Sequence, residues 1–337
     1  MTTPLRIGIL STANIAHPFC DGLAGSSSVQ VVAVGSRSAE AAAAFAQRHG
    51  IARVHASYDA LLADPEVDAI YNPLPNSLHA PWSEKAMRAG KHVLCEKPLT
   101  VTLAEAQALF AVARETGRVL LEAYPYRYQP QTRRMRQLIE EGAIGEVRSV
   151  QSYFGFNLSP GTNIRFDPAL GGGATLDAGC YAVSLARLAV GRRPLGVTAQ
   201  AIYTDSDVDL RLTGTIHYEG GAVAQVGCAM NGAVHRAATI LGSAGLIETD
   251  YQNHTDARRG CYLRLRRGSG WDASSENVPF EFGDGFRLEA EHFAGLVRGN
   301  AAAGDDTLLT LQNMATLEAL LKSARAGGAV VAVSAAA

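Results

Sequence analysis

Apolar and polar positions follow two different patterns along the chain, and the first pattern covers about 120 residues. There, short runs of β-branched residues alternate with Ala-rich stretches in which apolar positions recur at helical spacing. This alternation is typical of βαβ units around a parallel sheet. Gly50, Gly90 and Gly117 follow three of the helical stretches, where a left-handed helix end favours glycine. The predicted strands span residues 6–10, 29–35, 53–55, 69–72, 92–95 and 119–123, and three predicted helices span 39–49, 78–89 and 103–116.

After residue 123 the pattern changes to longer strands in which apolar and polar positions alternate, which is typical of an antiparallel sheet. The sequence Glu219-Gly220-Gly221 predicts a hairpin turn within it. The predicted strands 146–156, 197–204, 208–218, 222–230 and 234–241 form a meander, and helices are expected at 131–141, 176–190, 286–298 and 306–326. We therefore predict an α/β plus α+β protein. Residues 1–123 form a Rossmann-type parallel-sheet domain, and residues 124–337 form an α+β domain on a large, mostly antiparallel open sheet.

Composition and charge narrow the functional classes. The 337 residues suffice for two domains, and 47% hydrophobic with 18% charged residues is the composition of a folded soluble protein. Thirty Lys and Arg against 32 Asp and Glu leave a formal charge of -2. No positive surplus is therefore available to attract nucleic acid or anionic lipid, and we expect neither partner.

The cysteines and histidines do not indicate disulfides or metals. The five cysteines are spread along the chain without a C-x-x-C spacing, and the nine histidines show no ligand spacing. The N-terminus has no apolar signal core, and no run approaches the roughly 20 apolar residues that a membrane span needs. We expect a cytoplasmic protein without a metal ion. No nucleophile elbow or phosphate loop supports acyl or phosphoryl transfer.

The first predicted strand runs directly into the sequence Gly-Ile-Leu-Ser-Thr-Ala-Asn-Ile-Ala at residues 8–16. A strand that turns into a helix offers free backbone N–H groups and a positive dipole end, which suit a pyrophosphate. The full G-x-G-x-x-G fingerprint would place glycines at Leu10 and Ala13, so a tight turn that needs small residues for packing is the alternative interpretation. The predicted cofactor contacts in this loop are Gly8, Ser11, Thr12, Ala13, Asn14 and Ile15.

The end of the second predicted strand indicates which dinucleotide binds. A carboxylate at this place would accept hydrogen bonds from a free ribose 2′-hydroxyl, but the sequence gives Ser36 and Arg37. A hydroxyl and a guanidinium suit the 2′-phosphate of NADP, because Arg offers a planar fork of donors. NADP is therefore favoured and NAD stays possible; an ordinary surface arginine is the alternative.

Two further segments lie where predicted strands end. Residues 72–79 follow one strand and open a helix, and Glu96-Lys97-Pro98 end the next. Ligands bind at this edge of an open α/β sheet, so Lys97 is placed to supply a positive charge or a proton near a nicotinamide. A surface ion pair is the alternative. The predicted cofactor contacts here are Pro73, Leu74, Asn76, His79, Glu96 and Lys97.

These motifs resemble those of the Gfo/Idh/MocA oxidoreductase family over nearly the whole chain. Glu96-Lys97-Pro98 is similar to the family's E-K-P triplet, whose Lys contributes to catalysis and whose Lys-Pro bond is often cis. Residues 8–16, Leu74 to His79, and Gly171 to Tyr181 resemble a narrower branch, that of dimeric dihydrodiol dehydrogenase and NADP-linked D-xylose dehydrogenase. In relatives, the free face of the second-domain sheet pairs with another subunit, which implies a homodimer or homotetramer.

Asp177 and Tyr181 stand four residues apart at the start of a predicted helix, so both side chains are expected on one face. The resemblance implies that Tyr181 transfers a proton, where many relatives have His. An unperturbed phenol is a poor base at neutral pH, but the ammonium of Lys97 would favour its ionised form. On the residues alone, a buried tyrosine and a helix-capping Asp177 are the alternative.

The sequence departs from the branch near the expected substrate site. In residues 122–131, Pro125 replaces a Met or Trp and Gln129 replaces a His, which leaves substrate identity open. Besides Asp177 and Tyr181, the predicted substrate contacts are Arg127, Asn157 and Arg165, with Asp167 in the same loop as Arg165. For Arg127 a structural ion pair is the alternative.

The combined expectation is an NADP-dependent dehydrogenase or reductase. It would move a hydride between the nicotinamide and a secondary alcohol or carbonyl of a sugar, cyclic polyol or dihydrodiol, with Lys97, Tyr181 and Asp177 as catalytic residues. Two alternatives stay open: a reductase of anhydrofructose or of a ketosugar, free or nucleotide-linked, and a catalytically silent NADP-binding sensor or regulator.

Overall fold

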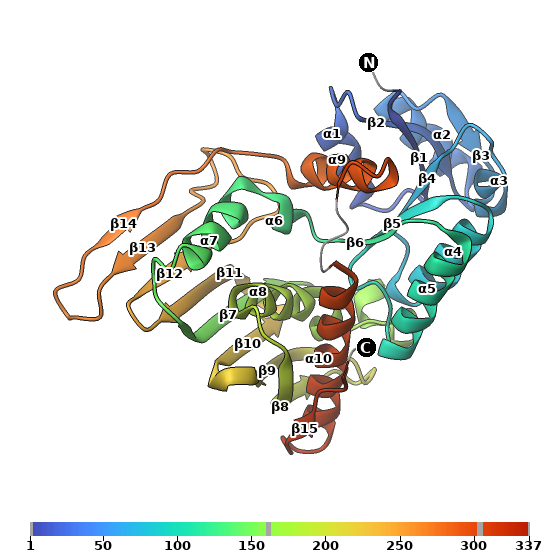
Figure 1. Ribbon diagram of the computed structural model, residues 1–337. Coiled ribbons are helices and arrows are strands. Elements are labelled where there is room, and N and C mark those ends of the chain that lie inside the picture. The colour runs from blue at the N-terminus through green and yellow to red at the C-terminus, as the bar shows by residue number, and fades with distance from the viewer. Residues whose placement is uncertain (1–2, 160–162, 302–305, 336–337) are drawn as a thin grey trace. The chain divides into compact units, whose positions relative to one another are not determined.

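The chain forms two compact units in the computed structural model, which describes residues 3–159, 163–301 and 306–335 (Figure 1). The first unit comprises Met1–Pro125 and Asp284–Thr307, and the second comprises Tyr126–Gly283 and Leu308–Ala337. This division differs in one respect from the predicted single boundary after residue 123. A segment near the C-terminus returns to the first unit, and only its tertiary contacts reveal this, because its sequence reads as an ordinary amphipathic helix.

The first unit is built on a six-stranded parallel sheet. Its strand order is β3-β2-β1-β4-β5-β6, so the order reverses between β1 and β4, as in dinucleotide-binding folds. The predicted Rossmann-type sheet is thus confirmed. The strands are β1 (Leu5–Leu10), β2 (Val29–Gly35), β3 (Arg53–His55), β4 (Ala69–Asn72), β5 (His92–Glu96) and β6 (Leu120–Ala123), and the helices are α1 (Ala16–Leu23), α2 (Ala39–His49), α3 (Tyr58–Leu62), α4 (Asn76–Arg88) and α5 (Leu103–Thr116).

The returning segment is α9 (Gly285–Val297), which packs against α1 beside the sheet. The carboxylate of Asp284 caps its first turn by accepting from the N–H groups of Phe286 and Arg287. Phe286 and Phe293 are buried on its inner face. This helix therefore completes the core of the first unit although it follows the whole second sheet in sequence.

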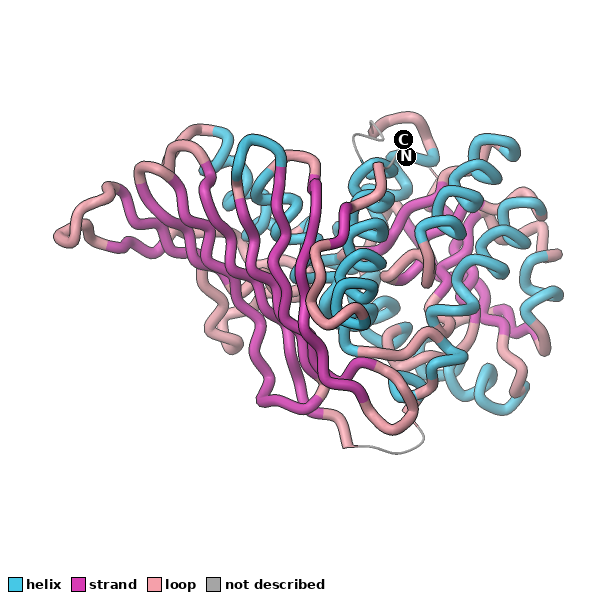
Figure 2. The backbone as a smooth tube through the Cα atoms, turned by 90° about the horizontal axis from the view of Figure 1, so that it is seen from below, coloured by secondary structure: helices cyan, strands magenta, loops and turns pink. Residues whose placement is uncertain are grey.

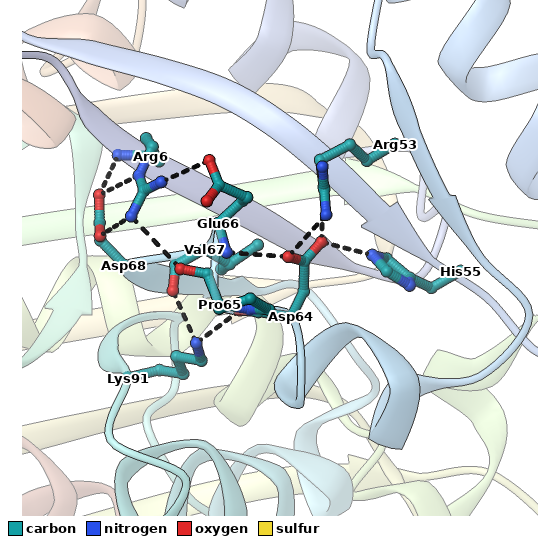
Figure 3. A network of polar contacts seen from close by, with 9 residues as sticks. All are labelled: Arg6, Arg53, His55, Asp64, Pro65, Glu66, Val67, Asp68 and Lys91. Carbon is teal, nitrogen blue, oxygen red and sulfur yellow. Dashed lines mark hydrogen bonds and ion pairs between the residues drawn. The ribbon is translucent and has the colours of Figure 1, made fainter.

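A network of charged side chains lies at the edge of this sheet where its strands begin (Figure 3). Arg6 at the start of β1 pairs with Asp68 at 2.7 Å. The carboxylate of Asp64, 4% exposed, accepts from Arg53 at 2.7 Å and from His55 at 2.8 Å. The buried ammonium of Lys91 donates to the carbonyl oxygens of residues 64 and 67. Each of these charges thus has partners within the described part of the chain.

The second unit is built on a nine-stranded mixed sheet of order β14-β13-β12-β11-β7-β10-β9-β8-β15. Strand β7 lies between β10 and β11 and runs parallel to β10, so the predicted simple meander is wrong, although the sheet is mostly antiparallel as expected. Side-chain alternation reports the faces of strands but not their neighbours. The strands are β7 (Val147–Asn157), β8 (Pro194–Tyr203), β9 (Asp209–Tyr218), β10 (Val223–Ala229), β11 (Asn231–Gly242), β12 (Gly245–Thr249), β13 (Leu263–Arg267), β14 (Ser275–Asn277) and β15 (Val331–Ala332).

The two faces of this sheet differ in what covers them. Helix α8 (Cys180–Val190) packs on β7 and β10, and α10 (Asp306–Arg325) places Leu317 and Leu320 beside Leu212 of β9. The opposite face carries a shallow hollow of about 810 Å³, over the strands seen as one continuous layer in Figure 2. Two short helices, α6 (Pro125–Tyr128) and α7 (Pro130–Glu140), lead into the unit. No helix among the described residues has both the length and the hydropathy of a membrane span.

Candidate active site

The loop between β1 and α1 presents backbone donors at the edge of the sheet where strands end. Ser11 adopts a left-handed conformation, φ 78°, and its N–H donates to the carbonyl of Gly35 at 2.7 Å. Among the described residues, the N–H groups of Thr12, Asn14 and Ile15 have no protein acceptor. Unpaired N–H groups before a helix form a site for an anion. The predicted loop therefore fits a pyrophosphate without the second and third glycines of the fingerprint.

Glycine at residue 8 is explained by packing. A Cβ atom there would lie 2.9 Å from Leu61 Cδ1, and a Cβ at Gly35 would lie 2.9 Å from Leu61 Cβ. Both glycines thus allow α3 to approach β1 and β2 closely. This finding fits the packing alternative for Gly8 and leaves the anion site to residues 11–15.

The end of β2 carries a hydroxyl and a guanidinium without a carboxylate. Ser36 is buried, and its Oγ accepts from the N–H of Ser38, whose own hydroxyl caps α2 by accepting from Ala41 N–H. Arg37 is exposed between these two. The turn is therefore fixed while the guanidinium stays accessible, which fits a dinucleotide that carries a 2′-phosphate.

Buried His79 joins the loops that follow β4 and β5. Its ring nitrogens lie 2.8 Å from the carbonyl oxygen of Pro98 and 2.7 Å from that of Leu74. Burial lowers the pKa of His79 to about 4, so the ring is neutral at physiological pH and donates to one carbonyl at a time. The Lys97-Pro98 bond, which the sequence left open, is cis.

Two carboxylates fix the backbone around Lys97. The hydroxyl of Tyr71 donates to Glu96 Oε1 at 2.7 Å, and Tyr71 itself stacks on Phe19 with 3.8 Å between ring centroids. Glu122 Oε1 accepts from the N–H of Leu99 at 2.9 Å. Sequence reasoning missed Tyr71 and Glu122; both are polar residues near the ends of predicted strands, and that position was the available signal.

The segment that carries Asp177 and Tyr181 begins as a π-helix, Thr175–Gly179, and continues as α8. Asp209 anchors it by accepting from Thr175 N–H at 2.7 Å and from the Thr175 hydroxyl at 2.6 Å. Burial raises the pKa of Asp209 to about 6, although both hydrogen bonds act in the opposite direction. Wide turns of this kind recur at functional sites.

The two predicted site residues of this segment each have a partner within the second unit. Asp177 pairs with Arg165 at 2.5 Å, whereas the hydroxyl of Tyr181 accepts from Nδ2 of Asn253 at 3.1 Å. Asp177 lies in the π-turn and Tyr181 in the first turn of α8. Tyr181 is buried, and its ring meets Phe154 edge-on at 5.5 Å.

The remaining predicted substrate contacts are more scattered. Arg127 is half-buried in α6, and Asn157 is exposed at the end of β7. Gln129, which departs from the related branch, is fully buried, and its Nε2 donates to the carbonyls of Asn253 at 2.6 Å and Gly283 at 2.9 Å. The change at Gln129 is thus explained by packing within the second unit. Among the predicted cofactor contacts, Pro73 and Leu74 are buried and Asn76 is half-buried.

Two protein-family models match the chain. The model described as "Oxidoreductase family, NAD-binding Rossmann fold" covers residues 5–124, and the one described as "GFO/IDH/MocA C-terminal domain" covers residues 132–248. Together they span both sheets described above.

Individual relatives extend the similarity over nearly the full length. The chain is 36% identical to a D-xylose 1-dehydrogenase (NADP(+)) of Haloferax volcanii, over 97% of this chain and 99% of that protein. It is 32% identical to a trans-1,2-dihydrobenzene-1,2-diol dehydrogenase of Xenopus tropicalis, over 85% and 87% of the two chains. The structure of KijD10, a 3-ketoreductase from Actinomadura kijaniata in complex with NADP and TDP-benzene, superimposes with a TM-score of 0.87 at 32% identity, over 95% and 98%.

Proposed function

The chain belongs to the GFO/IDH/MocA oxidoreductase family, and from this premise we propose that it is an NADP-dependent oxidoreductase acting on a secondary alcohol or carbonyl of a sugar, cyclic polyol or dihydrodiol. The proposal is supported mainly by the groups found at the edge of the first sheet where its strands end. Unpaired N–H groups at residues 12, 14 and 15 serve the pyrophosphate, and Arg37 serves the 2′-phosphate. Matching relatives bear names that include NADP.

Bound NADP supplies the hydride donor or acceptor at C4 of its nicotinamide. The residues of the chain bind, orient and move a proton. In the oxidation direction the oxygen of Tyr181 takes the substrate hydroxyl proton, and the ammonium of Lys97 stabilises the developing negative charge. His79 and Glu122 keep the backbone beside Lys97 in place. Asp177, oriented by Arg165, positions the substrate.

A second candidate is reduction of a nucleotide-linked ketosugar. It is supported by the close superposition on a 3-ketoreductase whose structure contains TDP-benzene. The two candidates differ in what binds beyond the reacting carbon, since a nucleotide adds a base and two phosphates. Activity on free sugars, compared with activity on a ketosugar nucleotide, separates them.

We further propose a homodimer that forms through the open face of the nine-stranded sheet. The hollow on that face is rich in Gln and Thr, with Gln151 Nε2 donating to Gln225 Oε1 at 3.2 Å. A tetramer is the alternative. Light scattering on the purified protein gives the mass directly, and Thr215→Arg, which places a charge in the hollow, is expected to yield monomers. The five free cysteines are compatible with a reducing cytoplasm, where we place the protein.

The test of the proposed activity is nicotinamide absorbance in both directions. Aldopyranoses, inositols and trans-dihydrodiols are offered with NADP or NAD, and a ketosugar nucleotide with NADPH. Tyr181→Phe and Lys97→Met are each expected to lower kcat by about 10²- to 10⁴-fold. Tyr203→Phe is the control, because the Tyr203 hydroxyl has no hydrogen-bond partner and lies on β8. Full activity in Tyr181→Phe would reject the assigned proton donor.

Cofactor choice is tested separately at residue 37. Removing a charge-assisted contact to the 2′-phosphate costs about 1.5 to 3 kcal/mol, so Arg37→Ala is expected to raise KM for NADP about 10- to 100-fold and to leave KM for NAD unchanged. Arg48→Ala, an exposed arginine on α2, is the matched control. An equal effect on both cofactors would contradict the assignment of Arg37.

A further inference from the structure

Arg236 on β11 carries a buried guanidinium surrounded by aromatic rings. Only 9% of the residue is exposed. Its central carbon lies 4.3 Å from the ring centroid of Tyr181, nearer than to the three other rings in contact. Those rings belong to Tyr251 at 4.6 Å, Phe154 at 4.8 Å and Tyr126 at 5.5 Å.

No carboxylate among the described residues balances this charge. Nη2 of Arg236 donates to Asn253 Oδ1 at 3.2 Å, and its buried Nε has no hydrogen-bond acceptor. A buried cation without a counter-ion is costly, and the faces of aromatic rings repay only part of that cost. An anion that forms beside this guanidinium is therefore strongly stabilised.

Three tyrosine hydroxyls lie near the guanidinium, and two of them are held in the neutral form. Tyr251 donates to the carbonyl of residue 153 at 2.9 Å, and Tyr126 shares a hydrogen bond with Ser184 at 2.8 Å. Burial raises the pKa of Tyr251 to about 12 and that of Tyr126 further. The oxygen of Tyr181 accepts a hydrogen bond from Asn253, whose amide is oriented by Arg236. The Tyr251 oxygen also accepts, from Ser152 Oγ at 3.2 Å, but its own proton is given to the carbonyl of residue 153.

We propose that Arg236 is a positioning residue that stabilises the phenolate of Tyr181, through its charge over the ring and through the Asn253 amide that it orients. The proposal rests on the proposed function only for the use of the phenolate, which is proton transfer to and from the substrate. In the oxidation direction the phenolate oxygen accepts the hydroxyl proton of the substrate, and in reduction the phenol returns it. Arg236 then favours the ionised form of Tyr181 from within the second unit itself.

Other titratable groups lie on the elements packed around α8. Asp177 on the preceding π-turn is paired with Arg165, so its charge is partly neutralised. Burial raises the pKa of the Cys228 thiol on β10, which keeps it neutral. The remaining titratable or charged groups are Cys180 on α8 itself, Tyr126 and Arg127 on α6, and Tyr251 after β12. Strand β7 contributes Phe154, which is apolar. Arg236 is a cation of the second unit that contacts the ring of Tyr181.

The experiment measures the ionisation of Tyr181 directly in the full-length protein. Tyrosine labelled with ¹³C at Cζ gives a resonance that moves on ionisation, and Tyr181→Phe identifies the signal. Arg236→Met removes the charge at similar volume and is expected to raise the pKa of Tyr181 by about 1 pH unit or more, whereas Arg236→Lys restores most of the difference. In the oxidation direction, the acidic limb of the pH profile of kcat/KM is expected to move with it. Arg266→Met is the matched control, since Arg266 also has a buried Nε without a partner but lies on β13.

Asn253→Leu keeps the guanidinium and removes the amide that links it to Tyr181. It is the second test variant and is used if Arg236→Met does not fold. It is expected to raise the pKa of Tyr181 by a smaller amount. An unchanged pKa of Tyr181 in either folded variant overturns the proposal. Because the resonance is read without substrate, this result is independent of turnover. Absence of activity, or full activity in Tyr181→Phe, rejects the proposed function instead.

Discussion

The two units bury charge in opposite ways. At the edge of the first sheet where strands begin, Asp64 is buried but receives hydrogen bonds from Arg53, His55 and the N–H of Glu66. In the second unit, Arg236 is also buried but faces aromatic rings and one amide. The charge of Asp64 is balanced by hydrogen-bond donors within the protein, whereas the charge of Arg236 leaves a positive potential at the ring of Tyr181.

This difference separates a charge that stabilises the fold from one that serves chemistry. A fully paired carboxylate lowers the free energy of the folded state but has no capacity left for a ligand. An unbalanced cation destabilises the free protein and stabilises whatever negative charge forms beside it. The two clusters should therefore respond to substitution in opposite ways, in stability for the first and in catalysis for the second.

The largest expected effect on stability comes from Asp64→Asn. The change leaves Arg53 and His55 without their anion, and the free energy of unfolding is expected to fall by about 3 to 4 kcal/mol, or less to the extent that half-exposed Arg53 is rehydrated. Urea unfolding measures it, and kcat is expected to stay unchanged. Asp59→Asn is the control, because its pair with Lys85 is exposed on both sides. A drop in kcat without loss of stability would contradict the structural role.

Lowering the pH should remove the stabilisation that the Asp64 carboxylate provides. The guanidinium of Arg53, with the N–H of Glu66 and the His55 ring, holds the pKa of Asp64 well below its ordinary value near 4. A depressed pKa stabilises the folded state above the unfolded pKa, and this contribution is lost as pH falls through the folded one. The difference between wild type and Asp64→Asn should thus be constant above about pH 5 and shrink below about pH 4.

The sequence predicted the first sheet well because its strands and helices are local patterns. Every strand except β3 contains a short apolar run, and the helices end at glycines such as Gly50 and Gly117, which adopt the left-handed conformation in the structure. The return of α9 and the insertion of β7 between β10 and β11 depend on contacts between distant segments. Periodicity within a segment carries no information about such partners.

The site residues divide in the same manner. Lys97 and Tyr181 stand in recognisable motifs, so they were predicted, although their roles remain predictions. Arg236 and Asn253 lie far from those motifs in sequence, and they reach the Tyr181 ring and hydroxyl only through folding of the second sheet. An arginine on a strand reads as a surface residue, and its burial was not visible without the structure.

Asp209 is an intermediate case, and its expected effect is smaller than that of Asp64. It is buried and accepts two hydrogen bonds from Thr175, and burial raises its pKa to about 6 although the charge of Arg325 acts in the opposite direction. The folded state then binds more protons than the unfolded state between about pH 4 and 6. The free energy of unfolding should therefore fall by roughly 2 to 3 kcal/mol as pH rises through this window. Above the window it should stay constant.

Asp209→Asn is expected to abolish that slope, because the amide keeps an acceptor for Thr175 but does not titrate. Urea midpoints at about pH 4.5 and pH 7 measure the slope in both proteins. Asp207→Asn, which removes an exposed partner of Arg325, is the control and should keep the wild-type slope. A slope that survives in Asp209→Asn would assign it to another carboxyl group.

The smallest expected effect on stability comes from Arg236→Met, and it provides the sharpest contrast with Asp64. Replacing a buried charge by an apolar side chain of similar volume is often neutral or stabilising, because the desolvation cost disappears together with the contacts. The free energy of unfolding should change by less than about 1 kcal/mol, while kcat/KM falls and its pH profile shifts. Urea unfolding and turnover on the same preparation measure both. A loss of several kcal/mol comparable to Asp64→Asn would mean that Arg236 belongs to the first kind of cluster, in which the charge is kept for the fold.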